Sequence, residues 1–104
     1  MQRIKILVVE TNEEMYVVET NTIYKTLYGL VYYPYNKMKL EEDIYLIYSK
    51  NTDDFLKKNR IINNTQIYGT FVILKEKNNE IISLNDNEIK RLKKYFQKEG
   101  DKSI

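Results

Sequence analysis

The sequence predicts an α+β domain, with a mainly antiparallel sheet of about five to six strands and two helices packed on it. Short apolar runs, either alternating or continuous, recur along the chain as in strands. Two other segments repeat apolar residues at spacings of three and four, as in helices. The 104 residues, of which 42% are apolar, suffice for one core. We therefore expect a single domain over residues 1–104, with residues 98–104 as a frayed tail.

The first predicted elements are a hairpin and a short helix. Residues 3–9 end in a continuous aliphatic run and read as a central strand, followed by a polar loop and a second strand at 15–19. Asn21 is the predicted N-cap of the helix, and Gly29 lies near its end. One apolar stripe is formed by Ile23, Leu27 and Leu30.

Two further strands are expected at 31–35 and 43–50, where apolar residues alternate. The charged segment 37–43 between them is predicted to be an exposed linker. Residues 51–64 are expected to form a helical turn and a structured loop, with Phe55 among their apolar anchors.

The last part of the chain is predicted as strand, hairpin and helix. "IYGTFVIL" at 67–74 reads as one buried strand in which Gly69 marks a bulge or close packing, and Asn78-Asn79 suits a type I′ turn into a strand at 80–83. Asn85 and Glu88 have the spacing of a capping box. The helix that follows has Ile89, Leu92 and Phe96 on one face and Gly100 as its predicted stop.

Composition removes several kinds of chemistry. The chain has neither cysteine nor histidine, which excludes disulfides, thiolate metal sites and Ser-His-Asp catalysis. Its acidic clusters, such as Asp53-Asp54, lie in segments that look exposed, and they lack the spacing of a calcium loop. Only a carboxylate magnesium site stays open on these grounds. We predict no enzyme activity, no cofactor and no metal site.

The tyrosine-rich stretch "GLVYYPYNKM" at 29–38 raises the question of a contact surface. Pro34 cannot donate a ladder hydrogen bond, so the stretch is placed at a sheet edge or bulge, with Tyr33 and Tyr35 on one face and Tyr32 on the other. Most of these rings are expected to form a wall of the core, leaving the outer ones for contact, since tyrosine is common in interfaces. The predicted partner-binding residues are Tyr32, Tyr35, Lys57, Lys58, Asn59 and Arg60.

The last helix carries cations opposite its apolar stripe, which is the usual arrangement of a surface helix. A second interpretation is contact with phosphate or with an acidic protein surface. The residues concerned are Lys90, Arg91, Lys94 and Lys98. The net charge of +2 does not by itself indicate a polyanion partner.

Four segments, in their order and spacing, resemble a known family. They are "IKILVVE" at 4–10, "NRII" at 59–62, "IYGTFVIL" at 67–74 and "SLNDNEIKRLKKYF" at 83–96. Together they resemble the small phage and mobile-element domains called domain of unknown function 3846. The resemblance implies a prophage, plasmid or conjugative-element setting, often among antirestriction-like genes, and implies no reaction. Asn59 and Arg60 match the Asn-Arg pair of that family.

Three functions follow as hypotheses. The first is a non-enzymatic binder that inhibits a bacterial defence component, for example a CRISPR effector, by covering its surface. The alternatives are a nucleic-acid-binding accessory protein and a sponge for a signalling nucleotide, the latter built across a homodimer. The apolar runs are shorter than the roughly 20 residues of a membrane span, so we expect no membrane partner and a cytoplasmic location in the host bacterium.

Overall fold

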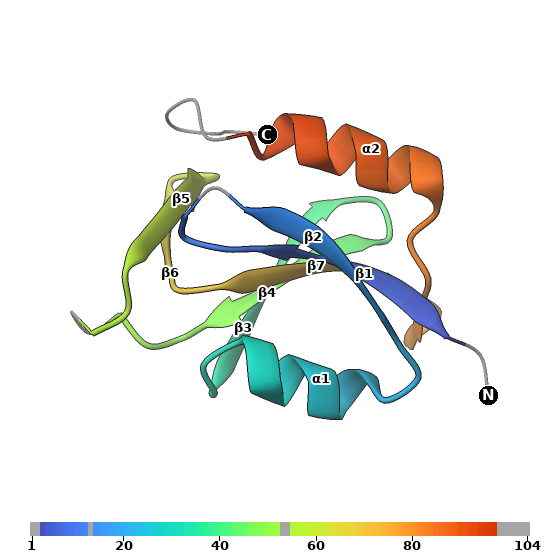
Figure 1. Ribbon diagram of the computed structural model, residues 1–104, viewed down its shortest axis with the longest axis horizontal. Helices are drawn as coiled ribbons and strands as arrows, with labels where there is room; N and C mark the ends of the chain where they lie inside the picture. The colour runs from blue at the N-terminus through green and yellow to red at the C-terminus, as the bar shows by residue number, and fades with distance from the viewer. Residues whose placement is uncertain (1–2, 13, 53–54, 98–104) are drawn as a thin grey trace.

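A computed structural model describes residues 3–12, 14–52 and 55–97 of the protein. It confirms the α+β class: two helices lie on either side of a mainly antiparallel sheet, and a small two-stranded sheet stands at one end (Figure 1). The elements are β1 (Ile4–Val9), β2 (Met15–Thr20), α1 (Ile23–Leu30), β3 (Tyr35–Glu41), β4 (Ile44–Ser49), β5 (Lys58–Ile62), β6 (Thr65–Tyr68), β7 (Phe71–Lys77), β8 (Glu80–Ile82) and α2 (Asp86–Tyr95).

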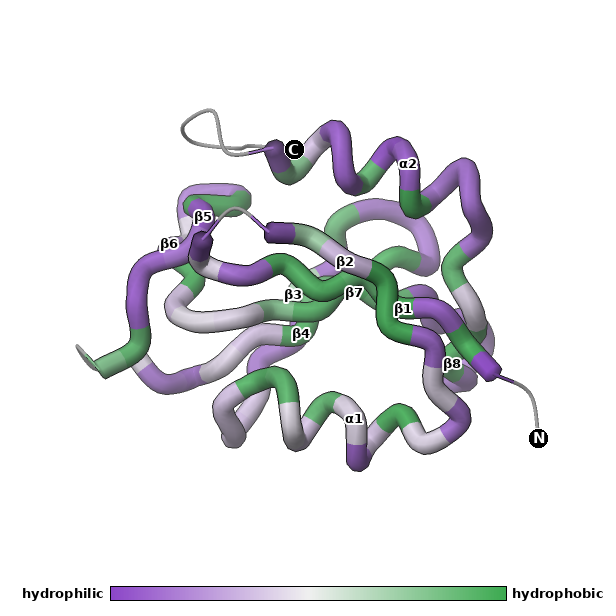
Figure 2. The backbone as a smooth tube through the Cα atoms, in the orientation of Figure 1, coloured by the Kyte–Doolittle hydropathy of each residue, from purple (hydrophilic) through white to green (hydrophobic). Residues whose placement is uncertain are grey.

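The main sheet has the strand order β2-β1-β7-β4-β3, with β8 paired to β7. Strands β1, β7 and β4 are central and are apolar on both faces, as Figure 2 shows for β1 and β7, because a helix covers each face. The small sheet consists of β5 and β6. Strands β2 and β3 are the edges of the main sheet.

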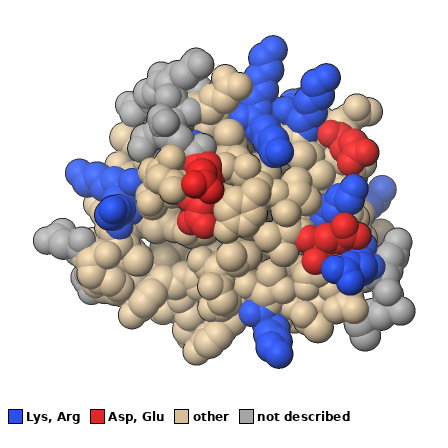
Figure 3. All heavy atoms as spheres, viewed as in Figure 1, with Lys and Arg blue, Asp and Glu red and all other residues tan. Residues whose placement is uncertain are grey.

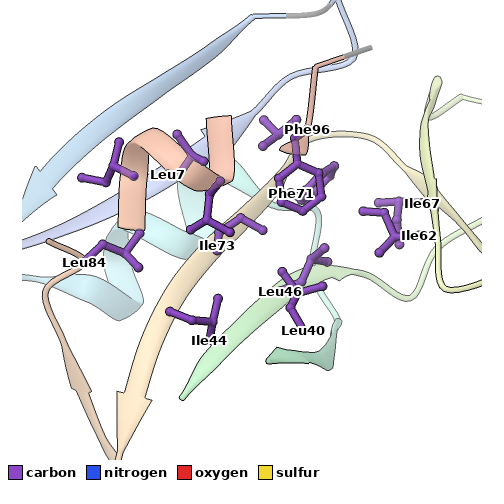
Figure 4. Packing of buried hydrophobic residues seen from close by; sticks show 13 residues of the cluster. Leu7, Leu40, Ile44, Leu46, Ile62, Ile67, Phe71, Ile73, Leu84 and Phe96 are labelled. Carbon is purple, nitrogen blue, oxygen red and sulfur yellow. The ribbon is translucent and has the colours of Figure 1, made fainter. Parts of the chain in front are cut away.

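Side chains alternate between the two faces of the sheet and so build two cores. On β1, Leu7 and Val9 join the core under α2, which includes Phe71, Ile73 and Phe96 (Figure 4). Ile6 and Val8 point the other way, and together with Val72 and Leu74 of β7 they meet Leu27 of α1 and Val31. The continuous apolar runs of β1 and β7 are thus explained by burial on both sides.

Three predictions about residues 21–43 are wrong. Thr22, and not Asn21, is the N-cap residue of α1, and its side chain makes no capping hydrogen bond. Residues 31–34 form a bend with a cis Tyr33-Pro34 peptide bond instead of a strand. The segment 37–43 is mostly strand β3, whose Lys37 and Lys39 point outward. Lysines are common on edge strands because they discourage pairing with another chain. Here they made the segment look like a charged linker, although Met38 and Leu40 alternate with them.

The segment 51–64 was also predicted wrongly, because it contains strand β5. Its hairpin to β6 turns at Asn63-Asn64, both at positive φ (50° and 65°), the same signal that correctly predicted the Asn78-Asn79 turn. The single strand predicted at 67–74 is two strands. Gly69, at φ 76°, lies at the corner where the chain leaves the small sheet and enters β7.

Helix α2 begins as predicted. Asn85 accepts a hydrogen bond from the Glu88 amide, and the Glu88 carboxylate accepts one from the Asn85 amide, which completes the capping box. The helix ends at Tyr95, with Phe96 as its C-cap. The predicted stop at Gly100 and the predicted tail at 98–104 lie outside the described residues.

Candidate functional site

Two of the predicted contact residues, Asn59 and Arg60, lie in the interior. The Arg60 guanidinium donates from Nε and Nη2 to the Phe96 carbonyl (3.1 and 2.9 Å) and from Nη1 to the Glu10 carbonyl (2.9 Å). Asn59 Nδ2 donates to the carbonyls of Val9 (3.1 Å) and Gly69 (2.8 Å). With exposed fractions of 2% for Arg60 and 8% for Asn59, the pair joins β5 to β1 and to the end of α2. Their prediction as surface contact residues is therefore corrected to an internal structural role.

The predicted basic residues on α2 are exposed, but they are not equivalent. Lys90 and Lys94 project into solvent, and Figure 3 shows several basic side chains over α2 at the top of the view. Arg91 Nη2 lies 2.6 Å from Oε1 of Glu41, and this contact raises the pKa of the guanidinium. Lys98 lies outside the described residues. Lys90 and Lys94 are therefore placed as on any solvated helix face, and their contact with phosphate or an acidic protein surface stays a prediction.

The strongest candidate site is on the α1 side of the sheet. Six large apolar residues are exposed in the described part of the chain, and five of them are aromatic residues of α1 and the segments near its end. We call these five the aromatic surface: Tyr24, Tyr28, Tyr32, Tyr33 and Phe55. Their exposed fractions run from 50% for Tyr32 to 76% for Tyr24, which is unusual for rings that could be buried.

Local structure holds these rings outward. In α1, Leu27 packs on the sheet, so Tyr24 and Tyr28, one turn apart, are directed to solvent. Val31 is buried and fixes the end of the helix, and the bend that follows leaves the next two rings exposed. In Figure 3 the lower left of the molecule, where Figure 1 places the end of α1 and the start of β3, shows no acidic or basic side chain on the visible face.

Ring contacts connect the members of the aromatic surface. The Tyr28 and Tyr33 centroids are 6.0 Å apart, and the Tyr33 ring meets that of Tyr35 edge to face at 5.2 Å. Tyr32 and Phe55 form a second edge-to-face pair at 5.1 Å. These contacts stabilise the rings in place while most of their area remains exposed.

Of the two predicted tyrosines, Tyr32 is on the surface and Tyr35 is half-buried. Burial raises the pKa of Tyr35, and its hydroxyl has no hydrogen-bond partner in the described structure. The prediction that most of the tyrosine stretch forms a wall of the core holds for Tyr35, which packs against the α1-side core.

A cleft of about 340 Å³ opens beside the aromatic surface. Its lining comes from the end of α1, with Tyr28 and Gly29, and from the segment before β5, with Phe55 and Lys57. We call this space the aromatic cleft; it is lined by Thr11, Tyr28, Gly29, Leu30, Val31, Tyr32, Phe55, Leu56, Lys57, Gly69 and Thr70. Its volume lies in the usual range of ligand sites, roughly 300–1,000 Å³.

The sequence analysis missed four residues of the aromatic surface. Tyr24 and Tyr28 flank the Ile23–Leu27–Leu30 stripe at a spacing of four, so a helical projection could have placed them outward together. Tyr33 was assigned to a strand that is not there. Phe55 was expected to be an apolar anchor and is instead 59% exposed, which no local pattern foretells.

The acidic side chains of the described residues are scattered. They contain no group of three or more acidic, histidine or cysteine side chains that could hold a metal ion. Glu10 accepts hydrogen bonds from the hydroxyls of Tyr16 (2.7 Å) and Thr70, and Thr70 lines the cleft. No helix in residues 3–12, 14–52 and 55–97 is long and apolar enough to cross a membrane.

Fold and site together define an α+β domain with a sheet covered on both faces and a large exposed aromatic surface beside a cleft. The chain belongs to the family described as Domain of unknown function (DUF3846), whose model matches residues 4–97. Neither a curated protein nor a solved structure matches the chain significantly.

Proposed function

We propose that this protein is a non-enzymatic binding protein of a phage or other mobile element, and that it inhibits a protein of a bacterial defence system, for example a CRISPR effector, by covering part of its surface. The observation that carries the proposal is the aromatic surface, five large rings exposed on one side of a small domain. The mobile-element setting rests on the family resemblance.

The aromatic surface has the properties of a protein-binding site. Exposed rings offer a large contact area and lose little rotamer entropy on binding, which is why tyrosine is frequent in interfaces. Tyr24, Tyr28 and Tyr33 form a ridge over α1 that a flat or shallow partner surface can contact. The ring hydroxyls then provide hydrogen bonds at the rim of the contact.

Enzyme activity has little support. Acid-base catalysis near neutral pH would require tyrosine, lysine or carboxylates alone, because the chain has no histidine or cysteine. Tyr16, whose hydroxyl donates to the Glu10 carboxylate, has its pKa raised to about 12, which makes it a weaker acid than an ordinary tyrosine.

The test is binding to purified defence complexes. Tagged protein is mixed with each complex, and phage or plasmid survival is measured in cells that express the protein. We expect one complex to be retained, and a Tyr28→Ser/Tyr33→Ser variant to lose most of this binding, because central aromatic residues dominate interface energy. A matched Lys90→Ser/Lys94→Ser variant on α2 keeps it. Absence of any bound complex together with unchanged survival contradicts the proposal.

A further inference from the structure

The aromatic cleft has a chemical character that the ridge of Tyr24, Tyr28 and Tyr33 lacks. We propose that it binds a nucleobase together with an adjoining phosphate, the chemistry shared by single-stranded nucleic acid and free nucleotides. The inference goes beyond the proposed function: Tyr28, Tyr32 and Phe55 belong both to the aromatic surface and to the cleft lining, whereas Lys57 and the backbone at the end of α1 belong to the cleft alone.

The walls of the cleft suit a planar ring. Tyr32 and Phe55 meet at an interplanar angle of 69°, and in such an edge-to-face pair the ring that gives its edge keeps its faces open. The two rings are 50% and 59% exposed, and the Tyr28 ring also lines the cleft. Proteins that hold single-stranded nucleic acid stack bases on exposed rings of this kind.

The end of α1 supplies hydrogen-bond acceptors for the edge of a base. The Val31 amide donates to the Leu27 carbonyl, so the last turn of α1 ends at the cleft, where the last carbonyls of a helix have no partner within the helix itself. Gly29 leaves this backbone uncovered, because no atom lies within 4 Å of the place where a Cβ would be. Acceptors favour bases that carry an amino group, namely adenine, cytosine and guanine, over uracil and thymine.

The rim of the cleft supplies positive charge for a phosphate. Lys57 lines the cleft and Lys58 follows it, while a hydrogen bond of 2.8 Å from the Lys50 amide to the Pro34 carbonyl holds Lys50 next to the bend of residues 31–34. All three lysines are exposed, and none forms an ion pair with a described residue. By contrast, Lys5, Lys37, Lys39 and Lys75 all have carboxylate partners.

The experiment measures fluorescence anisotropy of labelled DNA and RNA oligonucleotides at low salt, with unlabelled mononucleotides and cyclic nucleotides as competitors. We expect adenine- or cytosine-rich strands to bind more tightly than thymine- or uracil-rich ones, and binding to weaken with salt. Competition by mononucleotides identifies a free nucleotide as the ligand. Binding of strands without such competition identifies single-stranded nucleic acid. Both results support the assignment.

Two cleft variants and two matched controls locate the binding. Phe55→Ser and Lys57→Glu are each expected to reduce affinity by about tenfold or more. Tyr24→Ser, an exposed ring outside the cleft, and Lys94→Glu, an exposed lysine on α2, are expected to stay within about twofold. All four residues are solvent-exposed, so thermal unfolding should confirm that each variant folds.

Two results overturn the assignment. One is absence of binding to any strand or nucleotide at low salt. The other is binding that Lys94→Glu abolishes and Phe55→Ser leaves unchanged, which is general attraction to the basic face of α2. Failure of this inference leaves the proposed function standing, because retention of a defence complex is measured without added oligonucleotide or nucleotide, and Tyr33 lies outside the cleft lining.

Discussion

The two helices cover opposite faces of one sheet and are built in opposite ways. Helix α2 has a complete capping box, acidic residues Asp86 and Glu88 in its first turn and basic residues Lys93 and Lys94 in its last. Each of these features stabilises the ends of the helix. The capping box gives hydrogen-bond partners to free amides, and the charged residues complement the helix dipole. Two of its residues, Ile89 and Leu92, are buried in the core. These features of α2 are all explained by its role in the stability of the fold.

Helix α1 has none of these devices. Its N-cap makes no side-chain hydrogen bond, its first and last turns carry no complementary charge, and only Leu27 is buried. Tyr24 and Tyr28 are left 76% and 71% exposed. Helix α2 has the capping and end charges that favour a stable helix, and α1 lacks them. Departures of this kind are common at functional sites, so we place the candidate site on the α1 side.

The largest expected effect belongs to the α2 side and tests whether Arg60 is structural. Arg60→Met fills a similar volume but leaves the carbonyls of Phe96 and Glu10 without their donor. We expect a loss of about 3–5 kcal/mol in the free energy of unfolding, measured by urea denaturation. Lys58→Met, two positions earlier and exposed, is the control and should change it by less than about 0.5 kcal/mol. If Arg60→Met is as stable as the parent protein but no longer binds the partner, Arg60 is a partner-binding residue and not a structural one.

The next effect compares the inner face of α2 with the outer face of α1. Leu92 is 3% exposed in the core under α2, and Leu92→Ala is expected to cost about 2–4 kcal/mol. Tyr28→Ser removes a larger side chain from α1, yet the expected cost is below about 1 kcal/mol because the ring is mostly in water. Thermal unfolding of both variants checks this. A large loss for Tyr28→Ser would show that the aromatic surface holds the fold together.

The helix caps are expected to differ by a smaller amount. Asn85→Ala removes the acceptor for the Glu88 amide and should destabilise the protein by about 1 kcal/mol. Thr22→Ala, at the same position of α1, removes only a contact of 3.3 Å between the hydroxyls of Thr22 and Thr20 and should cost about half as much or less. Equal losses, measured as shifts in the urea midpoint, would mean that α1 is capped as firmly as α2.

Glu88 adds a pH dependence to the α2 cap. Burial alone would raise its pKa, but the hydrogen bond from the Asn85 amide and the ammonium of Lys75, at 2.9 Å, outweigh burial and lower it below the ordinary 4.5. The ionised carboxylate therefore stabilises the folded state above about pH 4.5, and this contribution is lost as the pH falls through the folded-state pKa.

Glu88→Gln isolates that contribution, because glutamine still accepts the capping hydrogen bond. The variant should be less stable than the parent at pH 7, by less than Asn85→Ala, and the difference should shrink at acidic pH. The measurement is urea denaturation of both proteins between pH 3 and pH 7. A constant difference across this range would show that the charge of Glu88 contributes nothing.

The difference between the α2 side and the α1 side also explains which elements could be predicted from the sequence. Elements governed by local rules, such as the capping box of Asn85 and the Asn78-Asn79 turn, were predicted correctly, and so was the central strand β1, whereas β7 was predicted only as part of one strand at 67–74. Strand β3 was missed because outward lysines on an edge strand mask the alternation of Met38 and Leu40.

The candidate site was harder to predict because it depends on contacts between distant segments. Arg60 and Asn59 looked like surface groups, and only the approach of β5 to residues 9–10 and to Phe96 shows that their donors are used internally. Phe55 joins Tyr32 across 23 positions of sequence, a pairing set by the fold of the whole chain and by no local spacing.

The smallest expected effect concerns Gly29 and would sharpen the contrast between the helices. The sequence placed Gly29 near the end of the helix, and α1 ends one residue later at Leu30, with Gly29 at no positive φ. Gly29→Ala should therefore stabilise the protein, by about 0.5–1 kcal/mol, since alanine loses less backbone entropy in a helix and meets no neighbour here. Gly69→Ala, at φ 76°, should lower stability instead. If Gly29→Ala raises the unfolding temperature but weakens nucleotide binding, Gly29 keeps the backbone of the aromatic cleft accessible to a ligand and lowers the stability of α1 in doing so.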